Sequence, residues 1–187
     1  MSDIVKLGLC MIVKNEEHCI ERCLESLSKY IQYWVICDTG STDRTKEVIT
    51  EFFEKKGIPG EIVDLPWKGF GASRSEALEC AKGKMEYAWM IDADDSLEGT
   101  PDLPNKLTAD GYSLKIKRGD FTWWRNHIFK MESNWRYEGV LHEYAACDAG
   151  ADMVCLPLNG DYHIEARTEG GRTRQLKICF LPSTKLF

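Results

Sequence analysis

The sequence predicts one α/β domain, with a Rossmann-like, mostly parallel sheet flanked by helices in its first half and a smaller, mixed or antiparallel second half. Three observations predict this fold class. Apolar, strand-like runs alternate with helical periodicities up to about residue 95, each such run ends at a polar cluster, and apolar and polar residues alternate beyond it. Strands that alternate with helices of about a dozen residues imply right-handed βαβ units and a parallel sheet.

The first two βαβ units follow from residue spacing. Residues 6–13 form an apolar run that predicts a buried strand, and a helix over residues 17–29 places its apolar side chains on one face. A second strand is predicted over residues 33–37. Ser41 or Thr42 is a candidate N-cap for the next helix, which should end at Gly57.

The same pattern continues to residue 95 and then changes. It predicts a strand over residues 61–65, a helix over 72–82 with Ser73 and Glu76 at capping-box spacing, and a strand over 87–91. The alternation in the second half predicts four further strands, over residues 111–117, 121–131, 137–146 and 153–158. A short helix is expected over 172–180, and residues 181–187 are expected to be a tail or a truncation point.

Charge and composition exclude several classes of protein. The 187 residues carry a formal net charge of -6, which lacks the broad basic surface that nucleic-acid binding requires. No stretch approaches the ~20 apolar residues of a membrane span, and the start of the chain has no signal-peptide pattern. The eight cysteines show no zinc-ligand spacing and are interpreted as reduced thiols. We therefore expect a cytoplasmic protein without a transmembrane segment.

An acidic cluster follows the last predicted parallel strand. Asp92, Asp94 and Asp95 are crowded at a strand end, where their mutual repulsion is unfavourable unless a cation lies among them. Mg²⁺ or Mn²⁺ is the natural occupant, with further ligands from substrate phosphates and water. The alternative is an acidic surface turn that caps a short helix near Ser96.

Two further residues follow strand ends or begin helices. Asp38 closes the second strand, where it either belongs to a capped loop or accepts a hydrogen bond from a base. Arg74 lies near a helix N-terminus, where a cation is unfavourable. Arg74 therefore either pairs with a neighbouring Glu or binds an anionic diphosphate.

Four motifs in this order resemble the family 2 glycosyltransferases, which have a GT-A fold. The motifs are LCMIVKNEE at residues 9–17, VICDTGSTD at 35–43, Arg74, and MIDADD at 90–95. A later segment, WRYEGVLHE at 135–143, resembles one branch of that family. The likeness covers about half of the chain.

The resemblance implies a role for each matching residue. Val13, Asn15 and Glu16 would line the nucleoside pocket, Asp38 would read the base, and Arg74 would approach the base or the phosphates. Asp92 and Ala93 would face the ribose and diphosphate. Asp94 or Asp95 would coordinate the metal, with His163 as a late ligand.

The acceptor side is less defined by the sequence. Glu143 is the candidate general base and His142 its neighbour in the catalytic region, although a strand-edge Glu paired with a cation is an equal alternative. His142 also competes with His163 for the metal. Arg172 is a candidate lid over the diphosphate, and one of the adjacent Trp123 and Trp124 is a candidate sugar platform.

The predicted function is metal-dependent, inverting transfer of a sugar from a UDP- or GDP-type donor to a saccharide, protein or lipid-linked acceptor, with Mn²⁺ or Mg²⁺ as cofactor. Residues 1–95 would bind the nucleotide sugar, and residues 96–180 would carry the acceptor and catalytic half. The alternatives are a sugar-phosphate nucleotidyltransferase and a noncatalytic nucleotide-sugar-binding module.

Overall fold

The computed structural model describes residues 5–139 and 143–170. His142, Arg172 and the helix expected over residues 172–180 lie outside the described residues. No described helix has the length and apolar character needed to cross a membrane.

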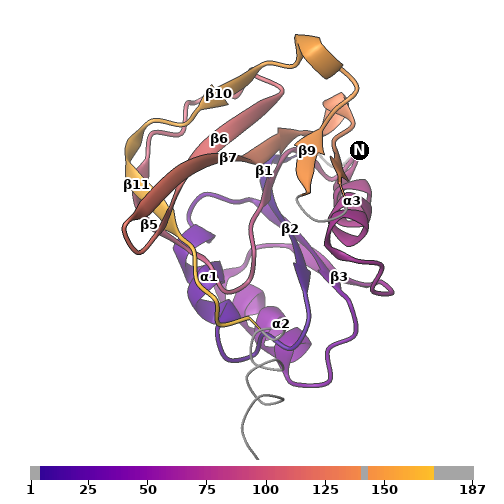
Figure 1. Cartoon of the computed structure of the whole chain (residues 1–187). Coiled ribbons are helices and arrows are strands. Elements are labelled where there is room, and N and C mark those ends of the chain that lie inside the picture. The colour runs from indigo at the N-terminus through magenta and orange to yellow at the C-terminus, as the bar shows by residue number, and fades with distance from the viewer. Residues whose placement is uncertain (1–4, 140–142, 171–187) are drawn as a thin grey trace, which may run out of the picture.

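The first half of the chain forms three βα units and a fourth strand. The elements in chain order are β1 (Val5–Val13), α1 (Ile20–Leu27), β2 (Tyr33–Asp38), α2 (Thr45–Lys56), β3 (Gly60–Asp64), α3 (Phe70–Ala81) and β4 (Met85–Met90). The strands are all parallel, in the order β3-β2-β1-β4. The parallel sheet predicted for this half is confirmed, with α1 and α2 on one side and α3 on the other (Figure 1).

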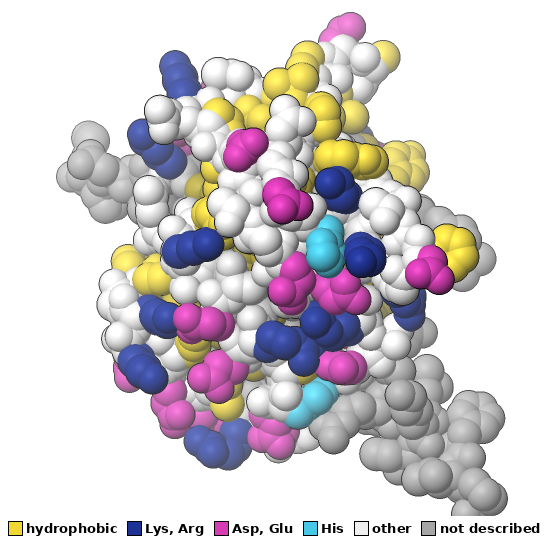
Figure 2. Space-filling view, turned by 90° about the vertical axis from the view of Figure 1, so that its left-hand side faces the viewer, with side chains coloured by type: hydrophobic (Ala, Val, Ile, Leu, Met, Phe, Trp, Pro, Cys, Tyr) yellow, Lys and Arg dark blue, Asp and Glu magenta, His cyan; other side chains and the backbone are white. Residues whose placement is uncertain are grey.

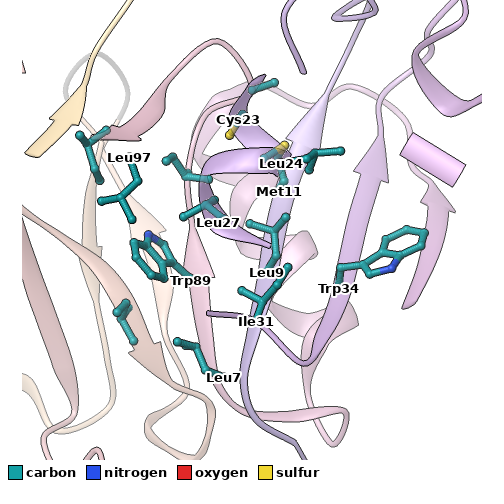
Figure 3. Packing of buried hydrophobic residues seen from close by; sticks show 14 of the residues in the cluster. Leu7, Leu9, Met11, Cys23, Leu24, Leu27, Ile31, Trp34, Trp89 and Leu97 are labelled. Atoms are coloured by element: carbon teal, nitrogen blue, oxygen red, sulfur yellow. The ribbon is translucent and has the colours of Figure 1, made fainter. Parts of the chain in front are cut away.

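From Leu7 onward the strand β1 is apolar because both faces of the sheet are covered there. Leu9 and Met11 pack in one core cluster with Leu24 and Leu27 of α1 (Figure 3). Cys10, on the opposite face, packs in a second cluster with residues of α3. Burial of both faces makes a shift in the pairing of β1 with its neighbouring strands unfavourable. Polar side chains therefore collect at the strand ends.

The second half extends the same sheet. Its elements in chain order are β5 (Ser96–Pro101), β6 (Gly111–Arg118), β7 (Phe121–Lys130), the 3-10 turn η1 (Met131–Ser133), β8 (Arg136–Glu138), β9 (Tyr144–Ala146), the 3-10 turn η2 (Gly150–Asp152), β10 (Cys155–Pro157) and β11 (Gly160–Glu165). Within the described residues, one nine-stranded sheet runs β3-β2-β1-β4-β7-β6-β11-β5, with β10 paired to β6. The junction β4-β7 is antiparallel, so the mixed second half is confirmed.

Several predicted elements differ from those observed. The strands β5 and β11 pair with each other antiparallel and were not predicted, and β5 begins at Ser96, where the alternative interpretation placed a short helix. The predicted strand over 137–146 is instead two short strands, β8 and β9, which form a separate two-stranded sheet.

The predicted N-caps of α2 and α3 are wrong. The helix α2 begins at Thr45, and Asp43 accepts the Thr45 N–H at 3.0 Å. The hydroxyl of Ser41 instead accepts the N–H of Asn15. The helix α3 begins at Phe70, so Ser73 lies inside the helix and is buried. The predicted end of α2 at Gly57 is confirmed by its left-handed conformation, φ 67°.

The surface carries acidic and basic side chains side by side. On the face shown in Figure 2, charges of both signs are interspersed across the middle, and hydrophobic side chains gather toward its upper end. On this face no broad basic area is visible among the described residues, in keeping with the formal net charge of -6.

Candidate active site

A cleft of about 840 Å³ opens at the carboxyl edge of the parallel strands. It is lined by residues 12–16, Thr39, residues 67–72, Tyr137, Gly139 and Glu143. These residues come from the ends of β1 and β2, the segment that enters α3, and the β8–β9 unit. Loops that follow the parallel strands therefore line one cleft, at the edge where open α/β sheets bind ligands.

Asp38 lies at the last position of β2 and is 2% exposed. Its Oδ1 accepts two backbone N–H groups, from Gly40 at 2.9 Å and Ser41 at 2.8 Å. Its Oδ2 is buried and has no hydrogen-bond partner among the described residues. A buried carboxylate oxygen without a donor is unfavourable, so this atom is suited to a donor supplied by a ligand.

The segment after β1 is held by side chains of the loop after β2. Val13 O accepts both the N–H and the hydroxyl of Thr39, each at 2.9 Å. Asn15 has φ 59°, and its Oδ1 accepts the Thr42 N–H at 2.7 Å. The Glu16 N–H donates a hydrogen bond to Thr45 Oγ1, at an N–O distance of 2.8 Å. The side chain of Asn15 thus joins the two loops.

Arg74 joins the two sides of the cleft. Its Nη2 donates to Asp92 Oδ1 at 2.6 Å, its Nη1 is 3.9 Å from Glu143 Oε2, and its side chain is 7% exposed. The guanidinium also lies over the rings of Phe70 and Tyr137. Burial opposes ionisation of Asp92, but Arg74, assisted by the charge of Arg125, holds the pKa of Asp92 below its usual value. The neighbouring glutamates of α3 are not the partners of Arg74, because Glu76 pairs with Lys68 and Glu79 pairs with Lys82.

Glu143 approaches the N-terminal turn of α3 closely. A Cβ atom at Gly71 would lie 3.1 Å from Glu143 Cγ, which is tighter than ordinary van der Waals contact. The glycine therefore allows the carboxylate to reach Arg74 and the cleft. The structure brings Glu143, Arg74 and Asp92 together from three segments that are distant in the sequence.

The acidic cluster follows β4. Ala93 is 5% exposed and belongs to the core, while Asp95 is 8% exposed. Burial, reinforced by the charge of Asp92, raises the pKa of Asp95 to about 7. This crowding of carboxylates favours a cation nearby, and the oxygen ligands of Asp94 and Asp95 fit a hard divalent ion.

A short segment after β11, residues 166–170, lies against the acidic cluster, and we call it the C-terminal strap. Asp94 Oδ2 accepts the N–H groups of Glu169 and Gly170 at 3.0 and 2.9 Å. Asp95 Oδ1 accepts the N–H of Arg167 at 3.0 Å. On α1, Arg22 donates to Glu169 Oε2 at 2.8 Å and to Asp94 O at 3.0 Å.

His163 lies on β11, where its Nε2 is 3.2 Å from Glu165 Oε2. In the part of the chain that the structure describes, no hydrogen bond joins His163 to Asp94 or Asp95. Its role as a late metal ligand stays a prediction. A different group, Glu16, His18 and Cys19, places its potential ligand atoms within 4.8 Å of one another beside the cleft.

Two residues of β7 that the sequence did not single out lie near the cluster. Arg125 is close enough for its charge to act on Asp92 and Asp95. His127 is 6% exposed, and its Nδ1 is 2.6 Å from Met90 O at the end of β4. The β6–β7 register shifts between Tyr112 and Ser113, so His127 is the extra residue of a β-bulge. Alternation of side chains cannot reveal a bulge, which is why these residues were missed.

A sheet of this strand order, a cleft at its carboxyl edge and an aspartate cluster after β4 define a GT-A nucleotide-diphospho-sugar transferase domain. The chain belongs to glycosyl transferase family 2, whose sequence model matches residues 9–149. The family and fold predicted from the four motifs are confirmed.

Individual proteins are similar to this chain over limited lengths. A TPR repeat-containing protein of Synechococcus elongatus is 33% identical over 150 residues, which are 75% of this chain and 35% of that protein. A poly(ribitol-phosphate) β-glucosyltransferase of Bacillus spizizenii is 32% identical over 99 residues, 49% of this chain and 15% of that protein. This chain thus spans about a third or less of the length of these relatives.

A solved structure shares the fold. S. aureus TarS in complex with UDP-GlcNAc superimposes with a TM-score of 0.63 and 16% identity, over 91% of this chain and 61% of that one. At this identity the similarity establishes the architecture of the chain.

Proposed function

We propose that the chain transfers a sugar, with inversion, from a UDP- or GDP-type nucleotide sugar to an acceptor hydroxyl. The observation that carries this proposal is the meeting of Asp38 Oδ2, the Arg74–Asp92 pair and Glu143 at one edge of the sheet. Family membership favours a transferase over a sugar-phosphate nucleotidyltransferase.

The nucleoside would bind at the ends of β1 and β2. Asp38 Oδ2 would accept a base N–H, a charge-assisted hydrogen bond that would satisfy its buried, unpaired oxygen. Backbone groups around Val13 and Asn15, together with Glu16, would line this part of the cleft. Asp92, already oriented by Arg74, would face the ribose.

The diphosphate would bind near the acidic cluster. Asp94 and Asp95 would hold Mn²⁺ or Mg²⁺, because three carboxylates follow β4 within four residues and such ions prefer oxygen ligands. When bound, this ion would neutralise charge on the leaving diphosphate. Arg172, outside the described residues, remains a candidate contact to the same group.

The acceptor would be activated by Glu143. Its carboxylate would take the proton of the acceptor hydroxyl as that oxygen attacks the anomeric carbon, and the nucleoside diphosphate would leave from the opposite face. The side chain of Glu143 is 20% exposed and lines the cleft, so it combines access with a fixed position. His142 stays a prediction for the same region.

The relatives support sugar transfer without defining the acceptor. The name of the Bacillus spizizenii relative describes β-glucosyl transfer, which supports a hexosyl donor here. Because the matched region is only 15% of that protein, its acceptor does not identify the acceptor of this chain. A saccharide, protein or lipid-linked hydroxyl remains the proposed acceptor class.

The decisive experiment replaces Glu143 by Gln, which preserves shape and removes the proton acceptor. We expect turnover to fall by roughly 10²- to 10⁴-fold with little change in donor affinity. Glu138→Gln is the matched control, because Glu138 pairs with Arg136 and Tyr144 in the same β8–β9 unit. The readouts are donor hydrolysis and transfer, each with and without Mn²⁺.

Three results would count against the proposal. Loss of donor binding in Glu143→Gln would show that this residue binds the donor and is not the general base. Wild-type turnover in the same variant would remove it from the chemistry. A wild-type chain that binds UDP or GDP sugars but never turns them over would instead be the noncatalytic module.

A further inference from the structure

Two adjacent tryptophans on β7 are exposed. Trp123 and Trp124 are 40% and 48% exposed, and Phe121, at the start of the same strand, is 78% exposed. Large aromatic side chains exposed together on a strand mark a contact surface more often than scattered apolar residues do. Neighbouring residues of a strand point to opposite faces, so the two indoles serve different surfaces.

The pairing of β6 with β7 identifies these two surfaces. Trp123 is paired with Ile116, and Arg125 with Leu114; both partners belong to the larger core cluster. Trp123 therefore lies on the same face of the hairpin as Arg125. Trp124 is paired with Lys115 on the other face, where the Lys115 ammonium lies 5.9 Å from its ring centroid.

The face that carries Trp123 is continuous with the reaction centre. The strands β4 and β7 are antiparallel, with Trp89 paired to Ile128 and His127 Nδ1 2.6 Å from Met90 O. The residues that follow β4, Asp92 among them, therefore continue beside the part of β7 that carries Arg125. Residues two apart on a strand are separated by roughly 6–7 Å. From this point beside Asp92, the residues Arg125, Trp123 and Phe121 follow one another along β7 toward the tip of the β6–β7 hairpin.

We propose that Trp123, continued by Phe121, is an acceptor subsite that stacks against a sugar ring of a saccharide acceptor. This inference rests on the proposed function, because it takes the acceptor to be a saccharide that reaches along β7 to the acidic cluster after β4. A pyranose has an apolar C–H face about as wide as one indole, and a rigid aromatic ring binds such a face with little loss of side-chain freedom.

A saccharide fits this surface better than a lipid or a protein. On this face Trp123 and Phe121 are followed along β7 by Arg125, and Phe121 is paired across the hairpin with Arg118. An acyl chain or a protein interface would need a broader continuous apolar area. A sugar ring needs one flat apolar face and hydrogen-bonding cations at its edge.

The test compares the full wild-type chain with Trp123→Ala and Trp124→Ala on a glycan array, with UDP and Mn²⁺ present. Trp124 is the matched control because it is the same residue type, with similar exposure, on the opposite face. We expect Trp123→Ala to weaken retention of the bound glycans roughly tenfold, the scale of one lost aromatic stacking contact. Trp124→Ala should retain them as the wild type does.

Folding and donor binding are measured in parallel. Trp123→Leu is the second variant, because leucine still covers Ile116 but lacks the flat ring, and it should show the same loss. Thermal unfolding and UDP affinity should match those of the wild type in all variants. If UDP binding and donor hydrolysis fail in the wild type while glycan retention depends on Trp123, the proposed function falls and the saccharide subsite stands.

Three outcomes would overturn the subsite. The first is equal weakening by Trp123→Ala and Trp124→Ala, or none by either. The second is a wild-type chain that retains no glycan of the array. The third is Trp123-dependent binding to phosphatidylcholine vesicles in place of glycans, which would assign the strip to a lipid surface.

Discussion

The two carboxylate oxygens of Asp38 have different environments, and this difference gives a sharp prediction. Oδ1 accepts two backbone N–H groups, and Oδ2 accepts none from the described residues. In Asp38→Asn the amide oxygen must stay where Oδ1 is, so the NH₂ group would face the base. We expect UDP or GDP binding to weaken by about 1–3 kcal/mol, measured by calorimetry, because a donor replaces the acceptor.

The control for this variant lies at the same sheet edge. Asp64 ends β3 in register with Asp38, but its side chain is 74% exposed and pairs with Lys46. Asp64→Asn should leave nucleotide affinity unchanged. If Asp38→Asn and Asp64→Asn behave alike, Asp38 does not contact the base.

His127 predicts how stability depends on pH. Burial lowers the pKa of His127 from 6.5 to about 4, although its contact with Met90 O opposes this shift. Between pH 6.5 and 4 the unfolded chain therefore binds a proton that the folded chain does not, and stability falls as the pH falls. The shift corresponds to about 3 kcal/mol at most, which is lost progressively between pH 6.5 and 4.

Replacing His127 by Gln tests this linkage. Gln retains an N–H donor for Met90 O but cannot be protonated, so stability should change less between pH 6.5 and 4.5 than in the wild type. Urea unfolding at a series of pH values measures the difference. An unaltered pH slope in His127→Gln would mean that other groups account for the acid sensitivity.

Sequence reasoning predicted that the candidate residues that follow strands of the parallel sheet lie at one edge. Asp38 and Asp92 come directly after apolar runs, so their convergence at one edge follows from topology. Arg125 and His127 reach the same place through antiparallel pairing of β7 with β4 and through a bulge. Neither long-range pairing nor a bulge leaves a local periodic signal.

At the scale of elements, the C-terminal strap is anchored by α1 and by the acidic cluster. Arg22 pairs with Glu169, while Asp94 accepts the strap N–H groups. We expect Arg22→Ala to accelerate amide hydrogen exchange in residues 166–170 and to leave exchange in β1 and β4 unchanged. Global stability should change by less than about 1 kcal/mol, because the ion pair is exposed.

The control for the strap is another exposed ion pair. Arg44 pairs with Glu51 on α2, away from residues 166–170. Arg44→Ala should not alter exchange in the strap. Exchange in residues 166–170 that is the same in Arg22→Ala and the wild type would show that Asp94 and Asp95 hold the strap without Arg22.

The elements that the sequence predicted best are those with a dominant local pattern. The strands and helices up to β4 carry continuous apolar runs or a 3.6-residue period, and their bounds differ from the predictions by a few residues. The strands β5 and β11 lack such a pattern. Gly99 and Pro101 interrupt β5, and only its pairing with β11 makes it a strand.

At the scale of the whole molecule, one sheet connects the two halves of the chain. The antiparallel junction of β4 with β7 places the strand that precedes Asp92 beside the strand that carries Arg125 and Trp123. The proposed acceptor face is therefore positioned by the same backbone hydrogen bonds as the acidic cluster. We infer that binding of the donor should stabilise the entire fold, because a ligand that binds only the folded state shifts the unfolding equilibrium of the whole domain.

Metal-dependent stabilisation is the prediction for the whole molecule. A nucleotide at a hundred times its dissociation constant adds about 2.7 kcal/mol, which for a chain of this size raises Tm by roughly 5–10 °C. UDP or GDP with Mn²⁺ should produce this shift, and EDTA should abolish it. Thermal unfolding of the full chain measures both.

Asp94→Asn identifies the ligand responsible for the metal dependence. Its amide oxygen can still accept an N–H of Glu169 or Gly170, so the strap contact persists while the anionic metal ligand is lost. The Mn²⁺-dependent shift should disappear with little change in Tm of the free chain. Asp102→Ala, an exposed carboxylate just beyond the far end of β5, should keep the full shift. A full Mn²⁺-dependent shift in Asp94→Asn would exclude Asp94 as the metal ligand, because removing its charge would then have no effect on the metal.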